Sequence, residues 1–211
     1  MSFWTPTLEW RGQPAYILGG GPSLREFEFS RISGRNVIGV NDAFRLGGSV
    51  VRMCLFGDAS WFHKIKWDLE KASKNMRIVS VATSLATLNV PWIQHLARTR
   101  RGLNPSPPIG YNLSTGAAAV NLAILLGATS IYLLGFDISA NNGRTHWHNH
   151  NHRPPNLASY ARFLRGFDWV HQGLSRFPHV RLYNVTNGGS KLVCFPRIPF
   201  ADFLRTLEVS P

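Results

Sequence analysis

Residues 114–137 constrain the fold more strongly than any other part of the chain. Ser114 and Thr115 are typical residues for the start of a helix, and the following run of residues 117–126 is mostly apolar and ends at a glycine. Residues 131–134 then form a short apolar run, which is typical of a strand buried on both faces of a parallel sheet. A buried helix followed by a buried strand predicts an α/β fold.

The remaining apolar segments fit the same pattern. No linker rich in serine, glycine or charge divides the chain, so we expect one Rossmann-like α/β domain over residues 1–211, with a mainly parallel sheet flanked by helices. The other predicted strands are residues 15–18, 36–40, 50–56, 76–82 and 180–185. Further helices are predicted after Asp58 and over residues 155–177 and 199–207, while the proline-rich segment 103–110 is a candidate lid.

Glycines and polar residues stand at the predicted strand ends. A parallel sheet brings these ends to one edge, where α/β folds bind ligands, and glycine amides together with a helix N-terminus suit phosphate. Each position also has a structural explanation as a turn or a helix cap. The candidate nucleotide-binding residues are Gly19, Gly20, Gly21, Pro22, Ser23, Asn41, Asp58, Ser114, Thr115 and Gly116.

Four histidines follow the strand that ends at Asp137. His146, His148, His150 and His152 occupy alternate positions, so an extended segment would point them to one side. Imidazoles can bind a borderline metal such as Zn²⁺, act as a general base or contact phosphate. A polar loop with incidental histidines is the remaining alternative.

The charge of the chain favours anionic partners. Lysine and arginine number 23 against 11 acidic residues, which gives a net charge of +12. We expect a polyanionic partner such as nucleic acid or a charged glycan, with a solvated basic surface as the alternative. No apolar run reaches the length of a membrane span, and the N-terminus does not resemble a signal peptide. We therefore expect a soluble cytoplasmic protein without a membrane span.

These motifs in combination resemble those of a known superfamily. The segments 16–24, 114–116 and 131–137, together with Asn41, look like motifs shared by bacterial family 42 sialyltransferases and archaeal 6-hydroxymethylpterin diphosphokinase-like proteins. Segment 184–195 resembles the closing strand and turn of the group. Related small proteins occur in bacteriophages, so we expect a phage-type member acting in a bacterial or phage-infected cell.

The sialyltransferase resemblance implies roles for particular residues. It places a cytidine nucleotide on residues 19–23, Asn41 and residues 114–116, and it places the catalytic base at His152 or, next, His150. The family's phosphate-binding tyrosines fall near Ser139 and residues 145–146 here, so the chain departs from the pattern at that point.

The diphosphokinase resemblance implies different chemistry. It matches Gly135, Asp137, Thr145 and His146, and it implies Mg²⁺ near Asp137 and Asp58. The candidate catalytic residues are thus His152, His150, His146 and Asp137. The candidate ligands of Mg²⁺ or another divalent metal are Asp137, Asp58, His146 and His148.

Three functions remain open at this point. The first is a glycosyltransferase that uses a CMP- or UDP-linked sugar and a histidine base. The second is a phosphoryl or pyrophosphoryl transferase that uses ATP and Mg²⁺. The third is a non-catalytic protein that binds nucleotides or nucleic acid.

Overall fold

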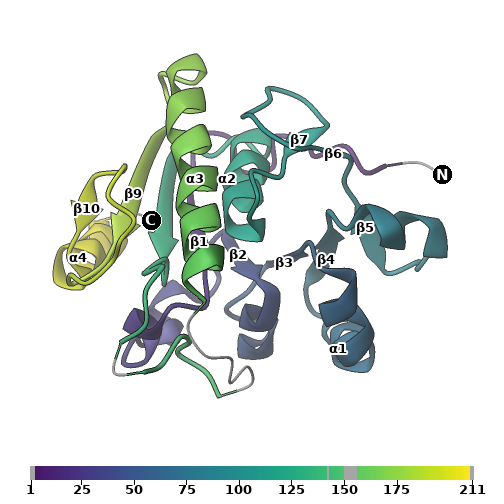
Figure 1. Cartoon of the computed structure of the whole chain (residues 1–211), viewed down its shortest axis with the longest axis horizontal. Coiled ribbons are helices and arrows are strands. Elements are labelled where there is room, and N and C mark those ends of the chain that lie inside the picture. Colours follow the sequence, from purple (N-terminus) through teal and green to yellow (C-terminus); the bar gives the residue numbers. More distant parts are fainter. Residues whose placement is uncertain (1–2, 142, 150–155, 210–211) are drawn as a thin grey trace.

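A parallel sheet forms the centre of the protein, as the sequence predicted. The computed structural model describes residues 3–141, 143–149 and 156–209 (Figure 1). Within this part of the chain, eight strands pair in parallel in the order β10-β9-β8-β1-β2-β3-β4-β5. The strands are β1 (Pro14–Leu18), β2 (Val37–Val40), β3 (Met53–Phe56), β4 (Arg77–Ser80), β5 (Ile93–His95), β8 (Ser130–Leu134), β9 (Arg181–Val185) and β10 (Arg197–Ile198). A separate ladder joins β6 (Arg98–Thr99) to β7 (Ile109–Gly110).

Helices cover both faces of this sheet. The helices are α1 (Ala59–Ala72), α2 (Thr115–Leu125), α3 (Leu157–Gly173) and α4 (Phe200–Val209). Side chains alternate along β1, so Ala15 and Ile17 join the apolar core that contains α2 and α3. Tyr16 and Leu18 face the second core, to which α1 and α4 contribute. Figure 1 shows α4 beside β9 and β10, and α1 below β4. The sheet is therefore apolar on both faces, as its continuous apolar strands predicted.

Helix α2 is buried along its whole length, and one polar side chain inside it fixes the neighbouring loop. Asn121 is fully buried. Its Oδ1 accepts hydrogen bonds from the backbone N–H groups of Asn104 at 3.0 Å and Gly110 at 2.9 Å, and its Nδ2 donates to the Asn104 carbonyl at 2.9 Å. These bonds hold segment 103–110 against α2. The segment does not line the cavity described below.

Several predicted boundaries differ from the structure. The strand expected over 50–56 begins only at Met53, because the N–H groups of Val50 and Val51 donate to the Gly47 carbonyl in a turn. Pro22 begins a single 3₁₀ turn, Pro22–Leu24. Residues 83–101 contain a 3₁₀ helix, Thr83–Leu88, followed by β5 and β6. None of these differences changes which strand ends meet at the carboxyl edge. In the described part of the chain, no helix combines the length and apolar character that a membrane crossing needs.

Candidate nucleotide-binding site

A cavity of about 320 Å³ lies at the carboxyl edge of the sheet. This volume is at the lower end of the range for small-molecule sites, about 300–1,000 Å³. Residues that follow β1, β2, β3 and β8 line it together with the start of α2 and part of α3. The predicted site residues that line it are Gly19, Gly20, Gly21, Asn41, Asp58, Ser114, Thr115, Gly116, His146 and His148.

The glycine loop after β1 packs directly against the end of β8. The N–H of Gly21 donates to the Gly135 carbonyl at 2.8 Å, and the N–H of Ser23 donates to Asp137 Oδ2 at 2.9 Å. A Cβ atom on Gly19 would lie 2.6 Å from the Gly135 oxygen, and one on Gly21 would overlap Asp137 Oδ2. Glycine is required at both positions because neither leaves space for a side chain.

Asp137 is therefore a support for the glycine loop. Its side chain is buried, it does not line the cavity, and burial raises the pKa of its carboxyl group although hydrogen bonds from Ser23 oppose that shift. Pro22 and Ser23 do not line the cavity either. These three residues support the glycine loop without lining the cavity.

The first part of the histidine-rich segment lies over the glycine loop. Trp147 donates from its backbone N–H to the Gly20 carbonyl at 3.0 Å and from its indole Nε1 to the Gly19 carbonyl at 3.1 Å. Phe29 packs on the Trp147 ring at a centroid distance of 5.0 Å. The His146 ring lies so close that a Cβ on Gly20 would be 2.7 Å from its Cδ2. Trp147 thus places His146 at the wall of the cavity.

One hydrogen bond and one ring contact orient the histidines. His146 Nδ1 is 2.8 Å from Thr145 Oγ1, and the rings of His146 and His148 have centroids 5.2 Å apart. The Thr145 hydroxyl can donate to or accept from Nδ1, according to the tautomer of the ring. His150 and His152 lie outside the described residues.

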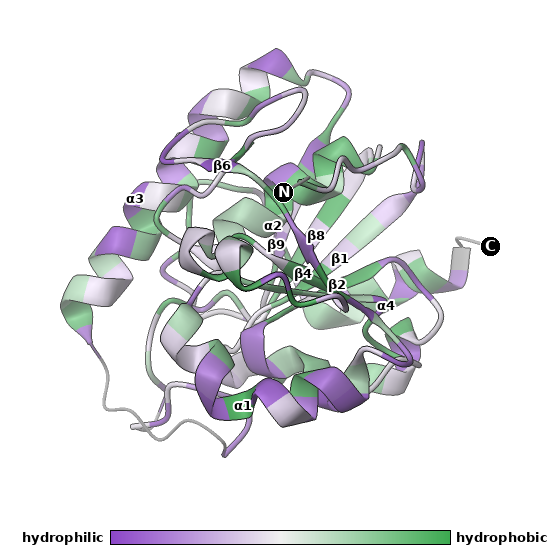
Figure 2. Cartoon of the chain, turned by 90° about the vertical axis from the view of Figure 1, so that its right-hand side faces the viewer, coloured by the Kyte–Doolittle hydropathy of each residue, from purple (hydrophilic) through white to green (hydrophobic). Residues whose placement is uncertain are grey.

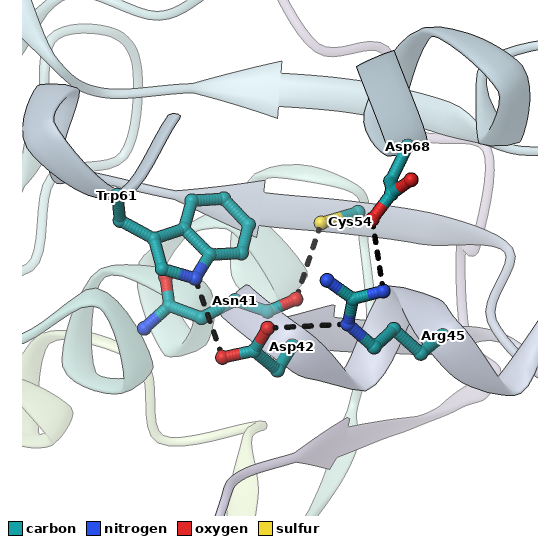
Figure 3. A network of polar contacts seen from close by, with 6 residues as sticks. All are labelled: Asn41, Asp42, Arg45, Cys54, Trp61 and Asp68. Atoms are coloured by element: carbon teal, nitrogen blue, oxygen red, sulfur yellow. Dashed lines mark hydrogen bonds and ion pairs between the residues drawn. The ribbon is translucent and has the colours of Figure 1, made fainter. Parts of the chain in front are cut away.

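Asn41 enters the cavity from the end of β2. Its backbone has φ of 52°, in the left-handed region that asparagine tolerates better than most residues. Its Oδ1 is buried and has no hydrogen-bond partner among the residues that the structure describes. Its backbone carbonyl accepts a 3.7 Å contact from Cys54 Sγ (Figure 3). A buried carbonyl oxygen without a donor is costly, so Asn41 is prepared to accept from a bound ligand.

The residues around Asn41 form a fixed polar network. Asp42 accepts from Trp61 Nε1 at 3.3 Å and pairs with Arg45 at 3.5 Å, and Arg45 also contacts Asp68 at 3.0 Å (Figure 3). Trp61 is thereby held at the cavity wall. Asp58 lines the same wall and caps α1, because its Oδ1 accepts from the N–H groups of residues 60 and 61. The capping alternative for Asp58 is thus confirmed.

The N-terminus of α2 faces the cavity without a side-chain cap. Ser114 occupies the N-cap position in an extended conformation but makes no capping hydrogen bond. The first N–H groups of a helix have no partner within the helix, and its dipole favours negative charge there. Phe136 packs against Gly116, where a Cβ would overlap the ring. The start of α2 and the glycine loop together make a suitable place for phosphate.

Several cavity residues were missed by sequence reasoning. Tyr111 precedes α2, Ser139 follows β8, and Tyr160 and Arg162 belong to α3. The Tyr160 hydroxyl is buried and has no hydrogen-bond partner within the described part of the chain. Burial and, to a smaller extent, the charge of Asp137 raise the pKa of Tyr160. Tyr160 and Arg162 gave no signal because only the packing of α3 against the sheet brings them to the cavity.

The predicted metal ligands do not form a cluster. Asp137 faces Ser23, Asp58 caps α1, and the rings of His146 and His148 are in contact. In the part of the chain that the structure describes, no three histidine, cysteine or acidic side chains are grouped to hold a metal ion.

Comparison with solved structures relates this fold to a sialyltransferase. The chain is similar to CstII from Campylobacter jejuni in complex with cytidine-5′-monophosphate, with a TM-score of 0.57 and 17% identity over 89% of this chain and 85% of the other. A structure of the same enzyme in complex with CMP-3FNeuAc gives a TM-score of 0.52 and 15% identity over 88% and 85% of the two chains. The sequence matches no protein-family model and no curated protein. The likeness shows a shared fold.

Proposed function

We propose that this chain is a glycosyltransferase that uses a nucleotide-sugar donor. The observation that carries the proposal is the Asn41 Oδ1 atom, which is buried and has no hydrogen-bond partner among the described residues, in a cavity that the start of α2 also lines. An acceptor on one wall and free N–H groups on another are complementary to the base or ribose and to the phosphate of a nucleotide. The CstII structures of similar fold contain CMP or a CMP-linked analogue, which supports a CMP-linked donor, with a UDP-linked donor as the alternative.

The two ends of the cavity suit the two parts of such a donor. Asn41, Trp61 and Asp58 would contact the nucleoside, and the glycine loop and the start of α2 would bind phosphate. Residues from α3, including Tyr160 and Arg162, would surround the sugar. Asp137 would keep the glycine loop in place through Ser23.

A histidine of the segment 146–152 would act as the general base. The acceptor hydroxyl gives its proton to the imidazole, and its oxygen forms a bond to the anomeric carbon of the donor. The bond from that carbon to the phosphate oxygen breaks, and the nucleotide leaves with the electron pair. The start of α2 and His146 stabilise the charge on the departing phosphate. By its resemblance to the sialyltransferases, we assign the base to His152 and, next, His150.

The test is nucleotide release from candidate donors. We would incubate the protein with CMP-linked and UDP-linked sugars and follow free CMP and UDP by anion-exchange chromatography. The variant His152→Ala should lose turnover while keeping nucleotide affinity, and the control His179→Ala, at an exposed position outside the cavity, should keep both. Turnover of ATP with Mg²⁺ but of no nucleotide sugar would overturn the proposal in favour of phosphoryl transfer.

A further inference from the structure

The outer face of α1 carries an exposed aromatic ring among lysines. Trp67 is 71% exposed, and Lys64, Lys71 and Lys74 are exposed on the same helix or just after it. The opposite face of α1 is fixed in the core through Phe62 and Leu69. Figure 2 shows α1 at the outside of the molecule, with hydrophilic residues along much of its length. An exposed tryptophan is unusual because its burial would be favourable.

The lysine charges on this face are not used within the protein. In the described residues, Lys64, Lys71 and Lys74 form no ion pair and no side-chain hydrogen bond. Asp68, the nearest acidic neighbour in sequence to Trp67, is paired with Arg45. Lys66 lies over the Trp67 ring, with its Nζ 5.3 Å from the centroid. Lys64, Lys66, Lys71 and Lys74 stand on α1 or just after it against two acidic residues of the helix, Asp68 and Glu70, so the net charge around Trp67 is positive.

Arg98, Arg100 and Arg101 form another basic cluster, and two of them contact aromatic rings of the protein. Arg98 stacks on Tyr111 at 4.2 Å, and Arg101 stacks on Trp169 at 4.9 Å and donates to Gln172. Two of its guanidinium groups thus have internal partners. Among the described residues, Lys64, Lys71 and Lys74 make no such ring contact, so their side chains are less constrained than those of Arg98 and Arg101.

We infer that the α1 face, defined as Lys64, Trp67, Lys71 and Lys74, binds single-stranded nucleic acid. Proteins that bind single strands combine a basic surface for the phosphates with aromatic rings on which bases stack. Trp67 can stack only on a base that is not already stacked in a duplex, so a single strand fits better than double-stranded DNA. A membrane fits less well, because the apolar side of α1 is buried and only one large apolar side chain of this face is exposed.

The position of α1 places such a strand next to the candidate site. The start of α1 contributes Asp58 and Trp61 to the cavity wall. Its other end reaches a second cavity of about 490 Å³, lined by Lys74, Arg52 and Arg77. α1 has 14 residues and is kinked at Ile65, where φ is −126° and ψ is 15°, so it spans at most about 21 Å between these two points. A bound strand would run from the basic cavity to the mouth of the candidate site. This inference stands independently of the proposed transfer reaction.

Fluorescence anisotropy with a labelled single-stranded oligonucleotide tests the inference. Trp67→Ala should weaken binding about tenfold or more, and Trp67→Phe should retain most of the affinity because phenylalanine still stacks. The triple variant Lys64→Ala, Lys71→Ala, Lys74→Ala removes three expected phosphate contacts. Each contact contributes about 0.7 to the slope of log affinity against log salt, so the magnitude of this slope should fall by about 2. The control Lys191→Ala removes an exposed charge that follows β9 and should change little.

Three results would overturn the inference. Trp67→Ala could bind the oligonucleotide as tightly as the unmodified chain. Alternatively, Lys191→Ala could reduce the salt slope as much as the removal of one α1 lysine does. A duplex of the same sequence could also bind as tightly as the single strand. Binding to vesicles of anionic lipid that depends on Trp67, without oligonucleotide binding, would assign the same face to a membrane surface instead.

Discussion

The imidazole of His146 rests on Gly20, where a Cβ atom would lie only 2.7 Å from His146 Cδ2. The glycine loop and the histidine-rich segment, 126 positions apart, therefore share one wall of the cavity. Trp147 fixes this contact through its two hydrogen bonds to the carbonyls of Gly19 and Gly20. A side chain at position 20 has to displace the ring.

The first prediction concerns this contact. Gly20→Ala should weaken nucleotide binding because the new methyl group displaces His146. In a His146→Ala background the same methyl group meets no ring, so Gly20→Ala should reduce nucleotide affinity less there than in the unmodified protein. Isothermal titration of the four proteins should give a coupling energy of about 1 kcal/mol. Strict additivity of the two substitutions would show that His146 and the glycine loop act separately.

The second prediction concerns the pH dependence of stability. Burial raises the pKa of Asp137 in the folded protein, so the folded state holds this proton more tightly than the unfolded state. As pH rises from the ordinary pKa of aspartate through this raised value, the unmodified protein loses free energy of unfolding. Asp137→Asn can still accept from the Ser23 N–H but does not titrate.

Urea unfolding at a series of pH values measures this effect directly. The stability of Asp137→Asn relative to the unmodified protein should increase as pH rises through that window and then level off. Taking the difference between the two proteins cancels the contributions of all other titrating groups. A difference that stays constant from about pH 3 to pH 7 would mean that Asp137 is not desolvated in the folded state.

The third prediction concerns Asn41. Asn41→Gly removes the amide but keeps a residue that accepts the positive φ of this position, so the fold should be retained. Loss of a hydrogen bond from the ligand to Oδ1 should weaken nucleotide binding about tenfold. Asn41→Ala should show the same loss of affinity together with lower stability, because alanine is strained in the left-handed region. Circular dichroism separates the two effects, and unchanged affinity in Asn41→Gly would remove Asn41 from the site.

The fourth prediction concerns the buried polar group of α2. Asn121→Ala should lower the free energy of unfolding by about 2–4 kcal/mol, because it leaves the N–H groups of Asn104 and Gly110 buried without an acceptor. Thr87→Ala, which removes an exposed side-chain hydrogen bond within a 3₁₀ helix, is the control and should cost much less. Equal effects of the two substitutions in urea titrations would contradict the role given to Asn121.

The residues at the carboxyl edge of the sheet could be predicted from the sequence because each of them lies close in sequence to the strand that positions it. A glycine or a polar residue follows each of these apolar strands within two positions, and parallel pairing alone brings Gly19, Asn41 and Asp58 to one side. The burial of residues 131–134 was predictable for the same reason, since strands covered on both faces are apolar throughout.

The rest depended on contacts between distant parts of the chain. Nothing near Trp147 in the sequence indicates that its indole bonds to Gly19, and the phase of α3 that brings Tyr160 to the cavity is set by packing. Asp137 has the composition expected of a ligand-binding carboxylate at a strand end. Its orientation toward Ser23 depends on the backbone conformation of the glycine loop, which lies far from Asp137 in the sequence.

The central claim is that the cavity binds a nucleotide, and a thermal-shift measurement with CMP, UDP and ATP, each with Mg²⁺ and with EDTA, tests it most directly. A nucleotide at about 100 times its Kd adds about 2.7 kcal/mol to stability, which raises Tm visibly. We predict a rise with CMP or UDP that persists in EDTA and is reduced in Asn41→Gly. The absence of a shift with every nucleotide, or an equal shift in Asn41→Gly, would contradict the claim.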